Sequence, residues 1–188
     1  MRVMCFAPRF EAPRFDEVKL AAPRPGGCDL GHDARGVPTC LRMQEDEPHT
    51  RPEITAALAR GVTRLLWNHG LASLLEVPLA NGRRADVMGL TARGDLWVVE
   101  TKSCVEDFTV DLKWPDYRDY CDLFYFAVTD AFPQELIPED VGLIVADQFG
   151  GAIVREAPLQ PLAGARRKAV TLLFARLAAQ RLAFTPPD

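Results

Sequence analysis

Two neighbouring stretches decide the fold of this chain: Arg-Arg-Ala-Asp-Val at residues 83–87 and Trp-Val-Val-Glu-Thr-Lys at residues 97–102. Their composition predicts two successive β-strands. Strand side chains alternate between faces, so we expect Glu100 and Lys102 on one face and Thr101 on the other. Two carboxylates, from Asp86 and Glu100, beside an ammonium group are typical of metal-assisted phosphodiester hydrolysis. The carboxylates hold Mg²⁺, and the lysine orients or helps to deprotonate the attacking water.

The register between these strands decides whether Asp86 joins the other two residues. A three-residue hairpin loop at residues 92–94 has its glycine at the position that favours a left-handed conformation. Pairing centred on Arg93 then sets Asp86 directly opposite Glu100, on the same face. A two-residue loop at Arg93-Gly94, or a bulge at the glycine, would instead turn Asp86 away.

An aspartate followed by Glu-x-Lys is a weak pattern by itself. The alternative is a solvated sheet face on which Glu100 and Lys102 form a surface ion pair. Both residues, however, end an otherwise apolar strand that begins with Leu96–Val99, where a surface pair is less expected. The pattern therefore favours a site.

The composition is that of one globular domain. The chain has 188 residues, of which 48% are hydrophobic and 26% charged. It shows neither a signal peptide nor an apolar stretch of transmembrane length. Its 5 cysteines lack metal-binding spacing, which argues against zinc and disulfides and for reduced thiols. We therefore expect a cytoplasmic protein with no membrane partner.

The net charge of −4 is unfavourable for binding nucleic acid, because phosphate attraction supplies much of that affinity. Positive charge is nevertheless concentrated locally, before Asp86 and at the start of the last predicted helix. The expected DNA contacts are Arg83, Arg84, Arg166, Arg167 and Lys168. The alternative for the second cluster is a solvated helix face.

The chain divides into a leader and a domain. Residues 1–48 carry five prolines before Arg42 and no sustained helical or strand period, so we expect them to be poorly ordered, with Met43 as an alternative start. The domain spans residues 51–183. Its predicted elements are a helix from Thr50 to Asn68, strands at 74–79, 83–91 and 96–102, a helical segment at 105–121 that breaks at Trp114-Pro115, strands at 123–128, 141–146 and 152–154, and a helix at 164–182.

This order of elements, with Asp on the second strand and Glu-x-Lys on the third, resembles the PD-(D/E)XK nuclease superfamily. The fuller wording resembles the MmcB family of alphaproteobacterial DNA repair proteins, which is linked to DNA-damage responses including that to mitomycin C. The resemblance covers roughly residues 51–182. It is carried by four motifs, Gly82–Val87, Val99–Ser103, Lys113–Asp122 and Gly142–Asp147.

The resemblance implies an α/β fold with a restriction-endonuclease-like αβββαβ core, in which helices flank a central mixed sheet. It implies that Asp86, Glu100 and the carbonyl of Thr101 are metal ligands and that Lys102 is the catalytic lysine. The cofactor would be Mg²⁺, with Mn²⁺ able to substitute. Implied partners are DNA and other DNA-damage-response proteins at the nucleoid, and a homodimer is one oligomeric state that it allows.

Two positions depart from the pattern of these relatives. Thr101 stands where the family usually has an apolar residue, and its side chain is expected to face away from the site. Ala85 replaces the proline of the superfamily's name, a common change.

Further site positions leave alternatives open. Glu76, in an apolar stretch where an unpaired carboxylate would be costly, is preferred as an additional catalytic acid over Glu53, which a helix cap explains. Lys113 and Tyr117 share a helix face. They either approach a DNA phosphate, or Lys113 lies on the surface and Tyr117 packs in the core.

The leading interpretation is therefore a Mg²⁺-dependent DNA endonuclease that acts in repair. A non-catalytic DNA-binding or scaffold protein on the same fold is the alternative from another class. A metabolite-binding α/β domain is a third interpretation, disfavoured because no glycine-rich phosphate loop is present.

Overall fold

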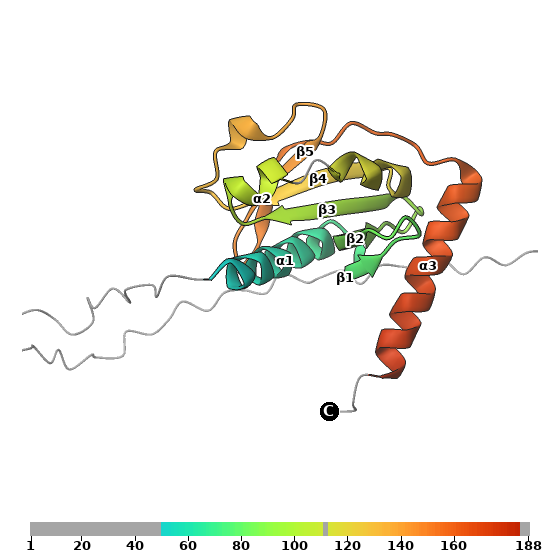
Figure 1. Ribbon diagram of the computed structural model, residues 1–188. Coiled ribbons are helices and arrows are strands. Elements are labelled where there is room, and N and C mark those ends of the chain that lie inside the picture. The colour runs from blue at the N-terminus through green and yellow to red at the C-terminus, as the bar shows by residue number, and fades with distance from the viewer. Residues whose placement is uncertain (1–49, 111–112, 185–188) are drawn as a thin grey trace, which may run out of the picture. The chain divides into compact units, whose positions relative to one another are not determined.

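Six strands form one mixed sheet with helices on both faces in the computed structural model, which describes residues 50–110 and 113–184 (Figure 1). In chain order, the elements are α1 (Arg51–Asn68), β1 (Ala72–Pro78), β2 (Arg84–Leu90), β3 (Leu96–Lys102), α2 (Val105–Val110), the 3₁₀ helix η2 (Trp114–Tyr120), β4 (Leu123–Val128), the 3₁₀ helix η3 (Gln134–Leu136), β5 (Gly142–Ala146), β6 (Gly151–Arg155) and α3 (Gly164–Ala183). The predicted fold class is confirmed. The predicted leader lies outside the described residues.

The strands follow one another across the sheet in sequence order. The pairs β1–β2, β2–β3 and β5–β6 are antiparallel, whereas β3–β4 and β4–β5 are parallel. A parallel pair requires a crossover connection, and the α2–η2 segment supplies the one between β3 and β4. The carboxyl ends of β3, β4 and β5 therefore lie at the same end of the sheet.

The two faces of the sheet bury separate apolar clusters. On one face α1 packs its buried residues, such as Leu58 and Leu66, against Val99 and Tyr125. On the other face α2, η2 and α3 pack against the cluster that contains Phe126. Figure 1 shows α1 along the sheet and α3 near the edge strand β1. β4 is apolar at every position because both of its faces are covered, as predicted.

Both ends of α1 lie where the sequence predicts them. The Thr50 backbone N–H donates to the Glu53 carboxylate at 2.7 Å, which satisfies one of the free donors of the first turn. At the other end, His69 Nδ1 lies 2.9 Å from the Leu65 carbonyl oxygen, and Gly70 takes a φ of 76°. The capping role predicted for Glu53 is confirmed.

The β2–β3 hairpin has the register that the three-residue loop predicts. Leu90 pairs with Leu96, which centres the hairpin on Arg93, and Gly94 takes the left-handed φ of 90°. The register runs to Val87 opposite Val99, and its continuation sets Asp86 opposite Glu100. The two-residue loop is excluded, because it would shift every pair by one residue.

The segment predicted as one helix with a break is two short helices, α2 and η2. Pro115 stands in the first turn of η2, where its missing N–H costs no helical hydrogen bond. Trp114 and Tyr117 stack on Phe124, with ring centroids at 5.6 Å and 6.0 Å, which fixes η2 to the sheet. Among the helices that the structure describes, none has the length and apolar character to cross a membrane.

Candidate functional site

Asp86 and Glu100 meet where the β2–β3 ladder ends. The Asp86 backbone N–H donates to Glu100 Oε1 at 3.2 Å. The Asp86 carboxylate in turn accepts two hydrogen bonds on Oδ2, from the Thr101 N–H at 2.8 Å and the Thr101 hydroxyl at 2.7 Å. The structure therefore brings together the three residues predicted to hold a metal.

Thr101 lies on the opposite sheet face from Glu100 and Lys102, as strand alternation predicts, because β3 stays in register with β4 through Thr101–Ala127 and Lys102–Val128. Its side chain was expected to face away from the site, but its hydroxyl donates to Asp86 Oδ2. The irregularity lies in β2 beyond the last regular pair, Val87–Val99, because Ala85 and Val87 pack in clusters on opposite faces of the sheet. Beyond that pair the Asp86 carboxylate reaches across the end of β3 and takes both Thr101 donors. Thr101 thus orients a candidate metal ligand through its hydroxyl as well as its backbone.

Glu100 and Lys102 are buried, with 4% and 7% of their surfaces exposed. Lys102 Nζ lies 5.9 Å from the centroid of the Phe126 ring, on the sheet face that α2, η2 and α3 cover. Charged groups are costly to bury, and the solvated surface pair considered as the alternative would not be buried. The burial therefore favours a site over a surface ion pair.

The donor set at this place suits a hard divalent cation. Carboxylate and carbonyl oxygens are the ligands that Mg²⁺ prefers in proteins. The two Thr101 donors both bind Oδ2 of Asp86, and among the described residues no other group donates to Oδ1. The same part of the chain holds no group of three His, Cys, Asp or Glu side chains able to bind a metal. The ligands on offer are therefore two carboxylates and a backbone carbonyl.

Glu76 lies in a strained, irregular part of β1. It has a φ of 51°, the one positive φ of a non-glycine residue among those described, and the β1–β2 register omits the Glu76–Asp86 pair. Arg181 of α3 donates to the Glu76 carbonyl at 3.0 Å and also to that of Leu75. A left-handed conformation costs a non-glycine residue about 1–2 kcal/mol, and such strain is concentrated at functional sites.

The Glu76 side chain is not buried, although its neighbours in the sequence are apolar. Its side chain is 50% exposed and pairs with Arg84, with Arg84 Nε at 2.5 Å from Oε2. The irregular backbone turns the carboxylate outward, which a strictly alternating strand would not do. Its predicted role as an additional acid stays a prediction.

The predicted DNA-contacting residues have different surroundings. Arg83 pairs with Asp116 at 2.8 Å, and Arg84, with 66% of its side chain exposed, pairs with Glu76. Lys113 and Lys168 are exposed. The Arg166 guanidinium lies 5.0 Å from the centroid of the Tyr120 ring. Tyr117 is buried, and its hydroxyl donates to the Arg84 carbonyl at 3.0 Å, so the structure favours the core alternative for Tyr117.

Arg167 is a structural residue, which corrects its prediction as a DNA contact. It binds the buried Asp122 carboxylate through two hydrogen bonds, at 2.6 Å and 2.7 Å. The backbone N–H groups of Leu96 and Leu162 donate to the same carboxylate at 2.8 Å and 2.9 Å. Burial raises the pKa of Asp122, but these hydrogen bonds outweigh it and lower the pKa below its ordinary value.

Sequence reasoning missed both Asp122 and Arg181. An aspartate directly before the all-apolar stretch 123–128 is a signal for a buried, saturated carboxylate, because an unpaired one there would be costly. Its partner Arg167 is 45 residues away, which no local pattern indicates. Arg181 carries no comparable signal, since it binds backbone carbonyls.

A family model described as "DNA repair protein MmcB-like" matches residues 44–186, which include every site residue discussed above. The chain belongs to the MmcB-like DNA repair protein family. A solved structure described as the SPO1766 protein of unknown function from Silicibacter pomeroyi is 49% identical, with a TM-score of 0.66. The match covers 68% of this chain and 88% of that one. No curated protein matches the chain.

Membership of the MmcB-like family confirms the resemblance to that family drawn from the sequence and gives the chain a role in DNA repair. The neighbouring structure supports the fold, and its description names no activity.

Proposed function

We propose that this chain is a Mg²⁺-dependent nuclease that hydrolyses DNA phosphodiester bonds in repair, most simply as an endonuclease. The observation that carries the proposal is the meeting of Asp86 and Glu100 at the open end of a strand ladder. Lys102 is buried two residues further along the same strand. Family membership supplies the DNA repair context.

Asp86, Glu100 and the Thr101 carbonyl would hold the Mg²⁺, with Mn²⁺ able to substitute. The bound ion would lower the pKa of its water and stabilise charge on the phosphate. Thr101 keeps the Asp86 carboxylate in place through two hydrogen bonds. The Lys102 ammonium, kept in a water-poor environment beside Phe126, would orient the attacking water and stabilise the charge that develops on the phosphate oxygens.

DNA would approach over the exposed basic side chains. Arg84, Arg166, Lys113 and Lys168 are accessible for phosphate contacts. Arg83 and Arg84 would exchange their carboxylate partners for phosphates. Because the chain carries a net charge of −4, we expect weak DNA binding that falls as salt rises and that other DNA-damage-response proteins would assist.

The test is to incubate the full chain with labelled nicked, branched, cross-linked and single-stranded DNA, in Mg²⁺, Mn²⁺ or EDTA. We expect metal-dependent cleavage that EDTA abolishes. Lys102→Met, which keeps the aliphatic packing, and Lys102→Ala should both abolish turnover and retain metal and DNA binding. Asp86→Asn should weaken both Mg²⁺ binding and cleavage. Arg93→Gln is the control, because it removes a charge whose side chain is 90% exposed at the hairpin.

A non-catalytic DNA-binding scaffold is the second candidate. The observation in its favour is that the described residues contain no three-residue metal-binding group. This alternative predicts no cleavage by the wild type and unchanged DNA binding in Lys102→Ala. Equal cleavage by the wild type and Lys102→Ala would instead show that the site is misassigned or that another nuclease is present.

A further inference from the structure

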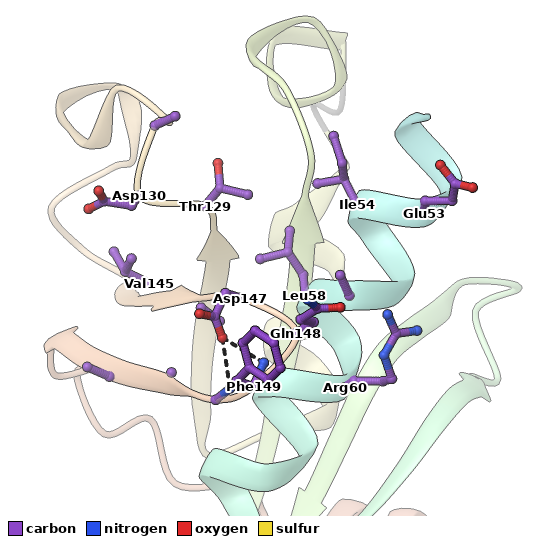
Figure 2. Close-up of a pocket in the computed structure, with 16 residues that line it drawn as sticks. Glu53, Ile54, Leu58, Arg60, Thr129, Asp130, Val145, Asp147, Gln148 and Phe149 are labelled. Atoms are coloured by element: carbon purple, nitrogen blue, oxygen red, sulfur yellow. Dashed lines mark hydrogen bonds between the residues drawn. The ribbon is translucent and has the colours of Figure 1, made fainter. Parts of the chain in front are cut away.

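A cavity of about 1000 Å³ opens beside the first half of α1 (Figure 2). Lys102 lies on the other face of the sheet, beside Phe126. Its walls come from α1, from the segment that follows β4 and from the β5–β6 turn. Asp86, Glu100 and Lys102 do not line it. The cavity lies at the carboxyl ends of parallel strands β4 and β5, where open α/β sheets commonly bind ligands.

The β5–β6 turn displays an aromatic ring at this cavity. Phe149 is 71% exposed, although apolar wall residues lie nearby. Asp147 Oδ1 accepts hydrogen bonds from the Phe149 N–H at 2.7 Å and the Gly150 N–H at 2.9 Å, shown as dashed lines in Figure 2. These bonds close the turn and define the direction in which Phe149 leaves it.

The turn is also fixed to α1. Arg64 donates to the Phe149 carbonyl at 3.3 Å. A Cβ at Gly61 would lie 1.9 Å from the Asp147 carbonyl oxygen, so only glycine lets the turn pack this closely. An exposed phenylalanine is unfavourable in water, and a fixed backbone keeps this one presented. The ring is therefore available to stack on a flat ligand.

The other lining groups describe that ligand. Ile54, Leu58 and Val145 give an apolar wall, whereas Asp130 and Gln148 bring hydrogen-bonding groups to the same cavity (Figure 2). The lining holds the carboxylates of Glu53, Asp130 and Asp147 against one guanidinium, that of Arg60. Such a lining repels phosphate and accepts hydrogen bonds from amino groups. The chemistry fits a neutral, planar heterocycle that carries an amino group.

We propose that this cavity binds an unpaired amino-bearing nucleobase, stacked on Phe149 with its amino group donating to the Asp130 carboxylate. The assignment of the base to DNA rests on the proposed function. Thr129, which lines the cavity, directly follows Val128, the residue in register with Lys102. The cavity and Lys102 therefore lie at the same end of the sheet, on opposite faces.

The experiment titrates the full chain into a short oligothymidylate that carries one fluorescent adenine analogue, with EDTA present to prevent cleavage. The wild type should quench the analogue, and Phe149→Ala should weaken binding by about 5- to 100-fold, as expected for the loss of one base stack. Phe149→Trp should restore binding. The control is Phe184→Ala, which removes an 85% exposed ring outside the cavity. Asp130→Asn should weaken binding of the adenine analogue more than that of oligothymidylate.

Two results would overturn the proposal: equal affinities for Phe149→Ala and Phe184→Ala, or equal binding of an oligonucleotide that lacks the base at the probe position. Free deoxyadenosine distinguishes the source of the ligand. If it binds as tightly as the oligonucleotide and depends on Phe149, the site takes free nucleosides, and its assignment to DNA falls. Base binding that depends on Phe149, without any cleavage, would support the base-binding cavity and contradict the proposed nuclease activity. Cleavage that depends on Lys102 but is unaffected by Phe149→Ala would support the nuclease activity and contradict the base-binding cavity.

Discussion

Buried carboxylates at the two ends of the parallel strands β3 and β4 have different hydrogen-bond partners. At the amino end, Asp122 receives four hydrogen bonds, from the Leu96 and Leu162 backbones and twice from Arg167. At the carboxyl end, Glu100 is similarly buried, and its carboxylate accepts a hydrogen bond from the Asp86 backbone N–H. The donors to Asp86 both bind one oxygen.

The difference separates a structural carboxylate from a candidate functional one. A saturated buried carboxylate has no lone pair left for a ligand and contributes to stability through its pairing. Asp86 and Glu100, by contrast, lie where the β2–β3 ladder ends, beside the strained residue Glu76, and such strain is concentrated at functional sites. We therefore expect changes at the Asp122 end to alter stability and changes at the Asp86 end to alter activity.

The largest effect is expected at the Asp122 end. Arg167→Met leaves the buried Asp122 carboxylate without its charged partner, so the free energy of unfolding should fall by about 3–5 kcal/mol. Urea denaturation measures this loss. The neighbouring Arg166→Met is the control, because Arg166 is exposed, and it should change stability by less than about 1 kcal/mol. Similar losses for the two variants would contradict the comparison.

Asp86→Asn should instead lower activity and leave stability almost unchanged. Replacing a ligand carboxylate by an amide removes negative charge from the metal site, so cleavage should fall by at least about 100-fold, or about 2.7 kcal/mol. Its free energy of unfolding in EDTA should stay within about 1 kcal/mol of the wild type. A severe loss of stability with retained cleavage would make Asp86 a structural carboxylate like Asp122.

Thr101→Val tests the side-chain hydrogen bond to Asp86 that the sequence did not predict. Valine keeps the shape and the backbone donor but removes the hydroxyl that holds Asp86 Oδ2. Groups that orient a metal ligand typically affect metal affinity by about 10- to 100-fold, and we expect the lower figure because one of two donors remains. Calorimetric titration with Mg²⁺ measures it. Thr101→Ser should restore the wild-type affinity, and failure to do so would assign the loss to packing.

Glu76 allows a test of the strained backbone. Glycine accepts a φ of 51° without strain, whereas a β-branched residue does not. Glu76→Val should therefore be less stable than Glu76→Gly by about 1–2 kcal/mol. Both variants lose the ion pair with Arg84, so it cancels in the comparison. Thermal denaturation that finds valine equal to glycine would mean that the backbone relaxes to an ordinary strand.

The smallest effect is the acid dependence of the Asp122 pair. The pKa of the Asp122 carboxyl is lower in the folded state than in the unfolded state, so the pair stabilises the fold fully above the unfolded-state pKa. That stabilisation is lost as the pH falls through the folded-state pKa of Asp122. Between about pH 5 and about pH 2.5, the wild type should lose more stability than Asp122→Asn. Equal slopes for the two proteins would show that other groups dominate acid unfolding.

Most of the fold was predictable because its signals are local. The bounds of β3 and β4, and the ends of α1, follow from runs of apolar residues, a capping box and glycine. The pairing of Asp86 with Glu100 follows from one loop length and the period of a strand. Short-range features of this kind depend on backbone geometry that neighbouring residues set, whichever tertiary contacts form later.

The sequence by itself determined the α/β class and the hairpin register that brings Asp86 to Glu100. Only the tertiary structure decided that Arg167 binds Asp122, that Glu76 faces outward and that Thr101 holds Asp86 through its hydroxyl. The first of these depends on partners far apart in the chain. The other two arise where regular pairing ends. At such places the energy of burying or pairing a charge outweighs the local preference of the backbone, and only the complete packing fixes that balance.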